Sequence, residues 1–240
     1  MDLGLKDKNV VITGGSTGIG AAMVKRFLDE GANVYFCGRN QQKITALLNE
    51  LDDLSQVHAK QLDVTIEADF NAWITEIGVV DIFIPNVSAM SGDWGKTIET
   101  DLLGTIRNVE AVIPAMTGTE PAVSFIGSVS AIMSEQSSSY ASIKAALTQY
   151  IHSLSQEHAG KIRFNTIAPA STLFPGSGWD QFRVAEPELF AEKANSHPMK
   201  RLATAEEISD VVTFISSPKA SYISGEVIHV DGGQRTSASL

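Results

Sequence analysis

Tyr140 and Lys144, four positions apart, are the residues of this sequence best suited to acid–base chemistry. On a helix, positions i and i+4 lie one turn apart on the same face. A nearby ammonium favours the phenolate, so we expect the pKa of Tyr140 to fall below the value of about 10 that is usual for tyrosine. A phenol tuned in this way can act as a general acid–base.

Ser128 is the third candidate of this group. It follows residues 123–126, an apolar stretch that predicts a strand, and Tyr140 begins the next predicted helix. We expect Ser128 to bond a substrate carbonyl oxygen, Tyr140 to give that oxygen a proton, and Lys144 to reach cofactor ribose hydroxyls. Taken singly, each residue is better explained by a turn or an amphipathic helix, so the hypothesis depends on their combination with a cofactor site.

Such a site is predicted near the start of the chain, at Thr13-Gly14-Gly15-Ser16-Thr17-Gly18-Ile19-Gly20. This turn joins an expected strand to an expected helix. Its glycines permit a close backbone approach, and the helix N-terminus offers N–H groups and a positive dipole end to a pyrophosphate. The expected cofactor contacts here are Gly14, Ser16, Thr17, Gly18, Ile19 and Gly20.

The end of the second expected strand indicates which dinucleotide binds. An acidic residue there would accept bonds from a ribose 2′-OH, whereas a basic one pairs with a 2′-phosphate. The chain has Arg39 and no acid at this point, which favours NADP over NAD. Asp63, next to Val64 after the third strand, is either an acceptor for the adenine amino group or a helix N-cap.

Apolar segments alternate with helical patterns along the whole chain. Strands are expected at residues 10–12, 34–36, 57–62, 82–84, 123–126, 162–167 and 227–230, and helices at 19–29, 41–51, 67–77, 95–116, 139–158 and 206–215. This alternation predicts a single α/β domain, a Rossmann-like doubly wound parallel sheet with helices on both faces. In residues 170–198 the apolar side chains follow no regular helix or strand periodicity, so this segment is expected to form an irregular loop that covers the substrate.

The amino-acid composition argues against several kinds of binding partner. The 240 residues carry a formal net charge of −10, which argues against nucleic acid or an anionic membrane as the main partner. Cys37 is the only cysteine, and the five histidines have no ligand spacing, so no metal site is expected. With no signal-like start and no long apolar run, the sequence favours a cytoplasmic location.

Taken together, these residues resemble the short-chain dehydrogenase/reductase family over nearly the whole chain. The resemblance rests on the glycine turn, on Ser128, Tyr140 and Lys144, and on the ending Gly225-Glu226-Val227-Ile228-His229-Val230-Asp231-Gly232-Gly233. It implies hydride transfer between NAD(P) and an alcohol or carbonyl, and often a homotetramer with contacts through residues 95–116 and the last strand. It also places Asn86, Pro169, Thr172 and the Ile167 backbone beside the cofactor.

Three positions depart from the family pattern. Pro85-Asn86-Val87-Ser88 replaces the usual Asn-Asn-Ala-Gly, and Pro85 removes a backbone donor. Asp101 stands at the family's fourth catalytic position, where Asn is usual, and its carboxylate would add charge near Lys144. Ala170 replaces the glycine of the motif Asn-x-x-x-Pro-Gly.

The expected substrate pocket is mostly apolar, which suggests a small hydrophobic or cyclic ketone or alcohol. Its expected lining is Ser130, Ile132, Met133, Gln136, Ser171, Leu173, Phe174 and Trp179. The leading hypothesis is therefore an NADP-dependent carbonyl reductase or alcohol dehydrogenase. The alternative is an NADP(H)-binding sensor or assembly partner with little catalysis, suggested by Pro85 and Asp101. An epimerase or dehydratase of nucleotide sugars usually needs a longer chain.

Overall fold

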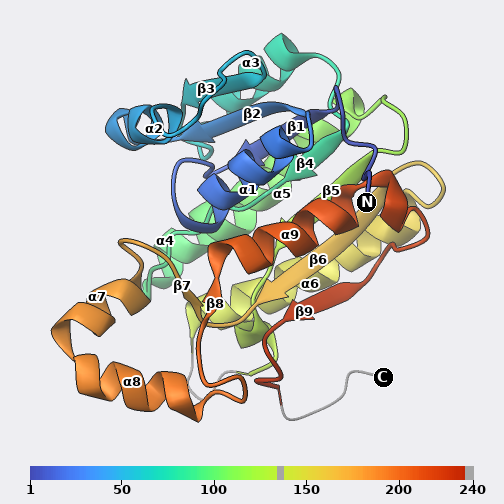
Figure 1. The fold of residues 1–240 in the computed structure, drawn as a ribbon. Coiled ribbons are helices and arrows are strands. Elements are labelled where there is room, and N and C mark those ends of the chain that lie inside the picture. Colours follow the sequence, from blue (N-terminus) through green and yellow to red (C-terminus); the bar gives the residue numbers. More distant parts are fainter. Residues whose placement is uncertain (134–137, 236–240) are drawn as a thin grey trace.

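Seven parallel strands make one sheet in the computed structural model, which describes residues 1–133 and 138–235. The strands are β1 (Asn9–Thr13), β2 (Asn33–Gly38), β3 (Val57–Gln61), β4 (Ile82–Ile84), β5 (Ala122–Ile126), β6 (Arg163–Pro169) and β9 (Val227–Val230). Their order across the sheet is β3-β2-β1-β4-β5-β6-β9. This arrangement confirms the predicted Rossmann-like fold, and the expected strands all form (Figure 1).

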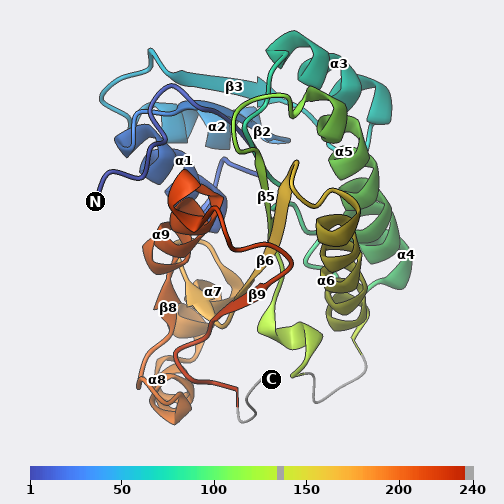
Figure 2. The same cartoon turned by 90° about the vertical axis from the view of Figure 1, so that its right-hand side faces the viewer.

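Helices cover both faces of the sheet, so its central strands β1, β4 and β5 are buried on both sides. On one face lie α1 (Gly18–Asp29), α2 (Gln41–Leu48) and α9 (Ala205–Ser216), which share a buried cluster with β1 and β2. On the other lie α3 (Glu67–Ile77), α5 (Gly104–Val112) and α6 (Ser139–Glu157). Figure 2 shows α1 and α9 on one side of the sheet and α5 and α6 on the other. No described helix is both long and apolar enough to cross a bilayer.

The strand order reverses at β1, which pairs with β2 on one side and β4 on the other. The connections from β1 and β4 therefore leave the sheet on opposite sides, and a crevice opens beyond their carboxyl ends. The glycine turn follows β1, and Asn86 follows β4. The fold thus brings these two loops together at the usual ligand position of an open α/β sheet.

The single helix expected at residues 95–116 is wrong in detail. The structure has α4 (Trp94–Thr97), then a π-helical segment (Ile98–Leu103), then α5 and a 3-10 turn (Ile113–Ala115). A π-helical turn widens the backbone ring by one residue and is frequent at functional sites. It carries Asp101, whose side chain is buried.

The irregular loop expected at residues 170–198 is also wrong. The segment forms a short strand β7 (Thr172–Leu173), α7 (Gly178–Ala185) and α8 (Pro187–Ser196), and β7 pairs with β8 (Ala203–Thr204). Ser177 caps α7 by accepting a bond from the Asp180 N–H, and Pro187 occupies the first turn of α8. These residues begin helices here rather than breaking them.

Arg163, at the start of β6, fastens the last part of the chain. Its guanidinium donates to the carbonyl oxygens of Ile215, Ser216, Ser217 and Ile223 at 2.8–3.2 Å. One half-buried cation thereby bonds free carbonyls at the end of α9 and in the turn that leads to β9.

Candidate active site

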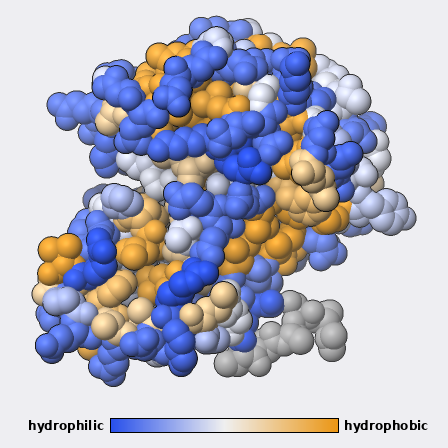
Figure 3. All heavy atoms as spheres, in the orientation of Figure 1, coloured by the Kyte–Doolittle hydropathy of each residue, from blue (hydrophilic) through white to orange (hydrophobic). Residues whose placement is uncertain are grey.

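A cavity of about 950 Å³ lies at the carboxyl end of the sheet. Figure 3 shows the surface hollowed between the α2 end of the molecule and helices α7 and α8. Its walls combine the glycine turn, the loops after β2, β3 and β4, the β5–α6 region and the segment after β6. A cavity of this volume has room for a dinucleotide and a small substrate.

The glycine turn has the geometry of a phosphate cradle. Gly14 and Gly18 have φ values of +67° and +58°, in the left-handed region that favours glycine. A Cβ on Gly20 would lie 2.1 Å from the Gly14 carbonyl oxygen. The turn is therefore closed as tightly as backbone allows, directly before α1 and its N–H groups. These features fit the pyrophosphate of a dinucleotide.

Asn86 holds this turn from the neighbouring strand. Its Nδ2 donates to the carbonyl oxygens of Thr13 and Gly14 at 3.1 and 3.2 Å, and its backbone N–H donates to Thr13 Oγ1. Pro85 is compatible with this arrangement because the regular pairing of β4 ends at Ile84, and the Pro85 carbonyl still accepts from the Ile126 N–H.

The expected adenosine end of the cavity contains cations. Arg39 is exposed at 71% of its side chain and lies 4.0 Å from Asp63 Oδ2. Lys43, on the first turn of α2, lines the same cavity, and so does Ser16. Asp63 Oδ1 accepts bonds from the N–H and hydroxyl of Thr65. The N-cap of α3 is Ile66, so the N-cap alternative for Asp63 is wrong.

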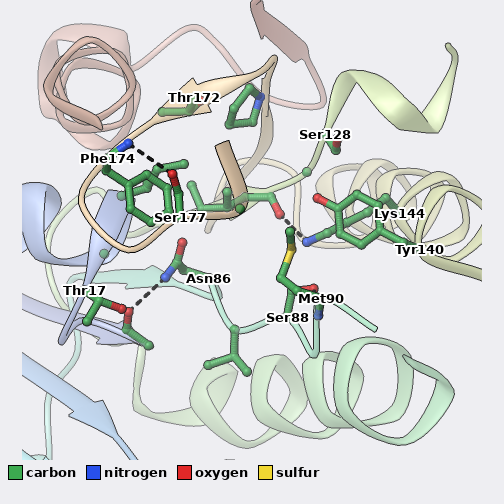
Figure 4. A pocket seen from close by; sticks show the side chains of 18 of the residues that line it. Thr17, Asn86, Ser88, Met90, Ser128, Tyr140, Lys144, Thr172, Phe174 and Ser177 are labelled. Atoms are coloured by element: carbon green, nitrogen blue, oxygen red, sulfur yellow. Dashed lines mark hydrogen bonds between the residues drawn. The ribbon is translucent and has the colours of Figure 1, made fainter. Parts of the chain in front are cut away.

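The three candidate catalytic side chains converge on the cavity (Figure 4). Lys144 Nζ lies 5.7 Å from the centre of the Tyr140 ring and donates to the Ile126 carbonyl at 2.7 Å. Ser128 Oγ accepts the Ser130 N–H at 3.1 Å, which leaves its own hydrogen free to be donated. The Ser128 side chain also hydrogen-bonds that of Tyr140.

The expected fall in the pKa of Tyr140 is wrong for this structure. Burial raises the pKa of Tyr140, the Ser128 hydrogen bond lowers it, and the charge of Asp101 raises it. Burial also lowers the pKa of Lys144 to about 8, against the opposing charge of Asp101. The ammonium bonds a backbone carbonyl and lies against the phenol ring, and it has too little effect on the hydroxyl to overcome desolvation.

Most of the predicted site residues line this one cavity. Those that do are Gly14, Ser16, Thr17, Ile19, Gly20, Arg39, Asp63, Val64, Asn86, Ser128, Tyr140, Lys144, Pro169 and Thr172. Gly18 does not: the Phe174 ring lies against it, 2.6 Å from where a Cβ would stand. Asp101 is buried behind the wall. Ile167 is fully buried, and its carbonyl accepts the Gly127 N–H at 2.7 Å.

The substrate part of the cavity is only partly as expected. Ser130, Met133, Ser171, Phe174 and Trp179 line it, whereas Leu173 does not, Ile132 is 59% exposed on the surface, and Gln136 lies outside the described residues. Several lining residues were not predicted as site residues from the sequence: Asn40, Lys43, Val87, Ser88, Met90 and Gln234. Lys43 carried a usable signal, as a cation four positions after Arg39 at a helix start.

An aromatic cluster connects the two helices beside the cavity. The rings of Trp179, Phe182 and Phe190 meet edge to face, with centroids 6.0–6.4 Å apart. Trp179 and Phe182 also line the cavity. No residue of α7 or α8 is buried, so this cluster is the main packing between them. These aromatic side chains therefore both pack the segment and present apolar surface to a ligand.

The fold and this site define a nicotinamide-dependent oxidoreductase, and comparison with known proteins agrees. A family model described as enoyl-(acyl carrier protein) reductase matches residues 14–235. Isoepoxydon dehydrogenase patN of Penicillium expansum is 32% identical, over 96% of this chain and 95% of the relative. 3-Oxoacyl-[acyl-carrier-protein] reductase FabG of Chlamydia muridarum is 32% identical, over 95% of this chain and 98% of the relative.

Among solved structures, L-sorbose reductase of Gluconobacter frateurii, in complex with NADPH and L-sorbose, superposes with a TM-score of 0.91 at 26% identity, over 99% of this chain and 100% of that one. The chain belongs to the short-chain dehydrogenase/reductase family. It is an oxidoreductase that acts on CH–OH and C=O groups. Within residues 1–133 and 138–235, no group of three or more His, Cys, Asp or Glu side chains is arranged to hold a metal ion.

Proposed function

We propose that this protein is an NADP-dependent oxidoreductase that transfers a hydride between nicotinamide and the carbonyl or secondary alcohol of a small, apolar or cyclic substrate. The observation that carries the proposal is the convergence of Ser128, Tyr140 and Lys144 on the cavity that the glycine turn also lines. The glycine turn would hold the pyrophosphate of a reduced nicotinamide dinucleotide, which would supply the hydride.

The chain's own residues supply the proton and hold the oxygen. In the reductive direction, the carbonyl carbon gains the hydride and its oxygen gains the proton of the Tyr140 hydroxyl, leaving a phenolate. Ser128 donates its hydroxyl hydrogen to the same oxygen as negative charge develops there. Lys144 supplies positive charge beside the phenol and stabilises the phenolate as it forms. Oxidation of the alcohol reverses these transfers.

The preference for NADP is supported by the charges at the adenosine end. Arg39 and Lys43 line the cavity beside Ser16, and no carboxylate occupies the end of β2. Asp63 reaches Arg39 only at 4.0 Å, so a 2′-phosphate would offer the guanidinium a closer, bidentate partner. Two structures similar to this chain are complexes with NADP or NADPH.

The substrate class is supported by the walls near Tyr140. Met90, Met133, Trp179 and Phe182 are apolar or aromatic, which suits a hydrophobic ketone or cyclic alcohol. Lys193 of α8 also lines the cavity. The names of the relatives include reductases and dehydrogenases of different compounds, so substrate identity calls for a direct screen.

The test is a screen of ketones and alcohols, with oxidation or reduction of the nicotinamide followed by absorbance. We expect turnover with NADPH and a lower KM for NADPH than for NADH. Tyr140→Phe is expected to abolish turnover while NADPH binding, measured by thermal shift, persists. A Tyr140→Phe protein that turns over at the parent rate refutes the proposed role of the phenol, and a lower KM for NADH refutes the cofactor preference.

The same screen separates the enzyme from a cofactor-binding sensor or assembly partner, which would bind NADPH and oxidise or reduce nothing on the panel. We further propose a cytoplasmic homotetramer with contacts through α4, α5 and β9. Light scattering that gives a monomer in solution would contradict this assembly.

A further inference from the structure

Asp101 is a buried carboxylate held at both of its oxygens. It is 1% exposed. The Ala89 N–H donates to Oδ1 at 2.6 Å, and the Ser88 hydroxyl donates to Oδ2 at 2.5 Å. Ser88 Oγ in turn accepts the Met90 N–H at 3.2 Å, which directs its own hydrogen toward Asp101. Both carboxylate oxygens therefore act as hydrogen-bond acceptors.

No cation neutralises this carboxylate within the described part of the chain. Asp101 takes part in no ion pair there, whereas Glu99, two positions earlier on the same π-helical segment, pairs with Arg107 at 2.8 Å. On the neighbouring α4 and α5, the charged side chains of Asp93, Lys96 and Glu110 are exposed to solvent and Arg107 is paired with Glu99, whereas Lys144 on α6 is buried. Asp101 and Lys144 are thus the charged groups buried on this side of the site among the described residues, and because both are buried their interaction is weakly screened.

The nearest titratable partners are the catalytic pair on α6. The segment that carries Asp101 packs on α6, and a hydrogen bond of 3.2 Å joins Thr97 Oγ1 to Ser139 Oγ, one residue before Tyr140. Burial is the larger influence on both groups: it raises the pKa of Tyr140 and lowers that of Lys144. The charge of Asp101 raises the pKa of both.

We propose that Asp101, clamped by Ser88 and the Ala89 N–H, is a positioning residue that holds the proton on the Tyr140–Lys144 pair. It thereby sets the pH at which carbonyl reduction fades and alcohol oxidation begins. The inference rests on the proposed function. Reduction requires the protonated phenol, whose proton moves to the substrate oxygen, whereas oxidation requires the phenolate, which takes the alcohol proton back. Because one group serves both directions, both pH profiles must move together.

The Ser88–Asp101 pair also explains two departures from the family pattern as one unit. An asparagine amide accepts hydrogen bonds at its oxygen and donates them from its nitrogen, whereas a carboxylate accepts at both oxygens and needs two donors. Ser88 and the Ala89 N–H are those donors. Ser88 and Met90 line the same cavity as Tyr140 and Lys144 (Figure 4), so the clamp also fixes one wall of the site.

The experiment compares Asp101→Asn with Glu99→Gln, which removes a carboxylate from the same segment at a position that is 52% exposed. The pH profiles of kcat/KM are measured in both directions. Independently of turnover, ionisation of Tyr140 is followed by ultraviolet difference titration against Tyr140→Phe. We expect Asp101→Asn to move both profiles and the phenol titration to lower pH by about one unit, and Glu99→Gln to move none of them.

A loss of kcat/KM in Asp101→Asn with unchanged midpoints would show a merely structural role and overturn the proposal. If that variant does not fold, Asp101→Ser, which keeps an acceptor for the Ala89 N–H, carries the same expectations. The wild-type titration is a test that needs no Asp101 variant: a Tyr140 midpoint below about 10 overturns the proposal. Absence of turnover with every substrate refutes the proposed function, while the phenol titration still decides this inference.

Discussion

Gly20→Ala is the sharpest test of the cofactor cradle. The new Cβ would lie 2.1 Å from the Gly14 carbonyl oxygen and 3.0 Å from Asn86 Nδ2, and contacts below 3.0 Å are essentially never found. The nearest atom is backbone, so no side-chain rotation relieves the clash. The turn must open, and the Asn86 bonds to Thr13 and Gly14 must lengthen.

The magnitude follows from these contacts. Forcing an added methyl into a closed site costs about 1–3 kcal/mol, and each weakened hydrogen bond adds about 1 kcal/mol. The higher helix propensity of alanine returns about 1 kcal/mol. We therefore expect Gly20→Ala to lose about 2–4 kcal/mol of stability and to bind NADPH at least about tenfold more weakly, since 1.4 kcal/mol corresponds to a factor of ten.

Urea unfolding measures the stability, and NADPH fluorescence titration measures the affinity. Gly95→Ala is the matched control, because Gly95 is helical and its Cβ would meet Asp93 Oδ1 at an ordinary 3.4 Å. We expect that variant to keep wild-type affinity. A Gly20→Ala protein with the affinity and stability of the wild type would refute the description of this turn as a closed cradle.

Three further changes give distinct outcomes. Lys43→Met should raise the KM for NADPH about fivefold and leave that for NADH unchanged, because it removes one exposed phosphate contact; Lys25→Met, outside the cavity, should change neither. Lys144→Met should abolish turnover yet raise urea stability near neutral pH by on the order of 2 kcal/mol. Burial lowers the pKa of Lys144 from 10.5 to about 8, so the wild-type free energy of unfolding rises between pH about 8 and pH about 10.5, where the folded protein has released this proton and the unfolded chain has not. The difference in stability between Lys144→Met and the wild type should therefore shrink over this pH range. A difference independent of pH would contradict the burial cost. Arg163→Met should lower urea stability by about 3 kcal/mol, because carbonyls at the end of α9 lose a charged donor; a loss below about 1 kcal/mol would show that water replaces it.

The sheet could be predicted from sequence because its signal is local. In a sheet covered on both faces a strand is typically a short apolar run, and a helix that joins two strands has apolar residues spaced at the helical period. The segment after β6 misled the same reasoning. Pro175, Gly176 and Gly178 suggested a loop, and Pro187 suggested a break, although proline is well suited to a first helical turn. The helices there are short and bury few residues, so they leave little periodicity.

The sequence predicted many of the residues that line the cavity, but it did not predict the charges and pKa shifts of the candidate site. The spacing of Tyr140 and Lys144 placed both on one face of α6. It could not show that Lys144 is buried and bonded to the Ile126 carbonyl, or that Asp101 is held by Ser88. The direction of a pKa shift depends on how burial and charge balance, and that balance is set by residues far apart in sequence.

The anchor at Arg163 has a consequence for how the chain reaches this structure. β6 receives its outer neighbour, β9, only across a loop that contains α7, α8 and α9, and Arg163 donates to carbonyls 52–60 positions further along. Closing so long a loop is entropically costly and slow. During synthesis, β6 must therefore wait at the edge of an incomplete sheet, with unpaired N–H and C=O groups, until β9 has been made. In that interval the nascent chain is most exposed to aggregation.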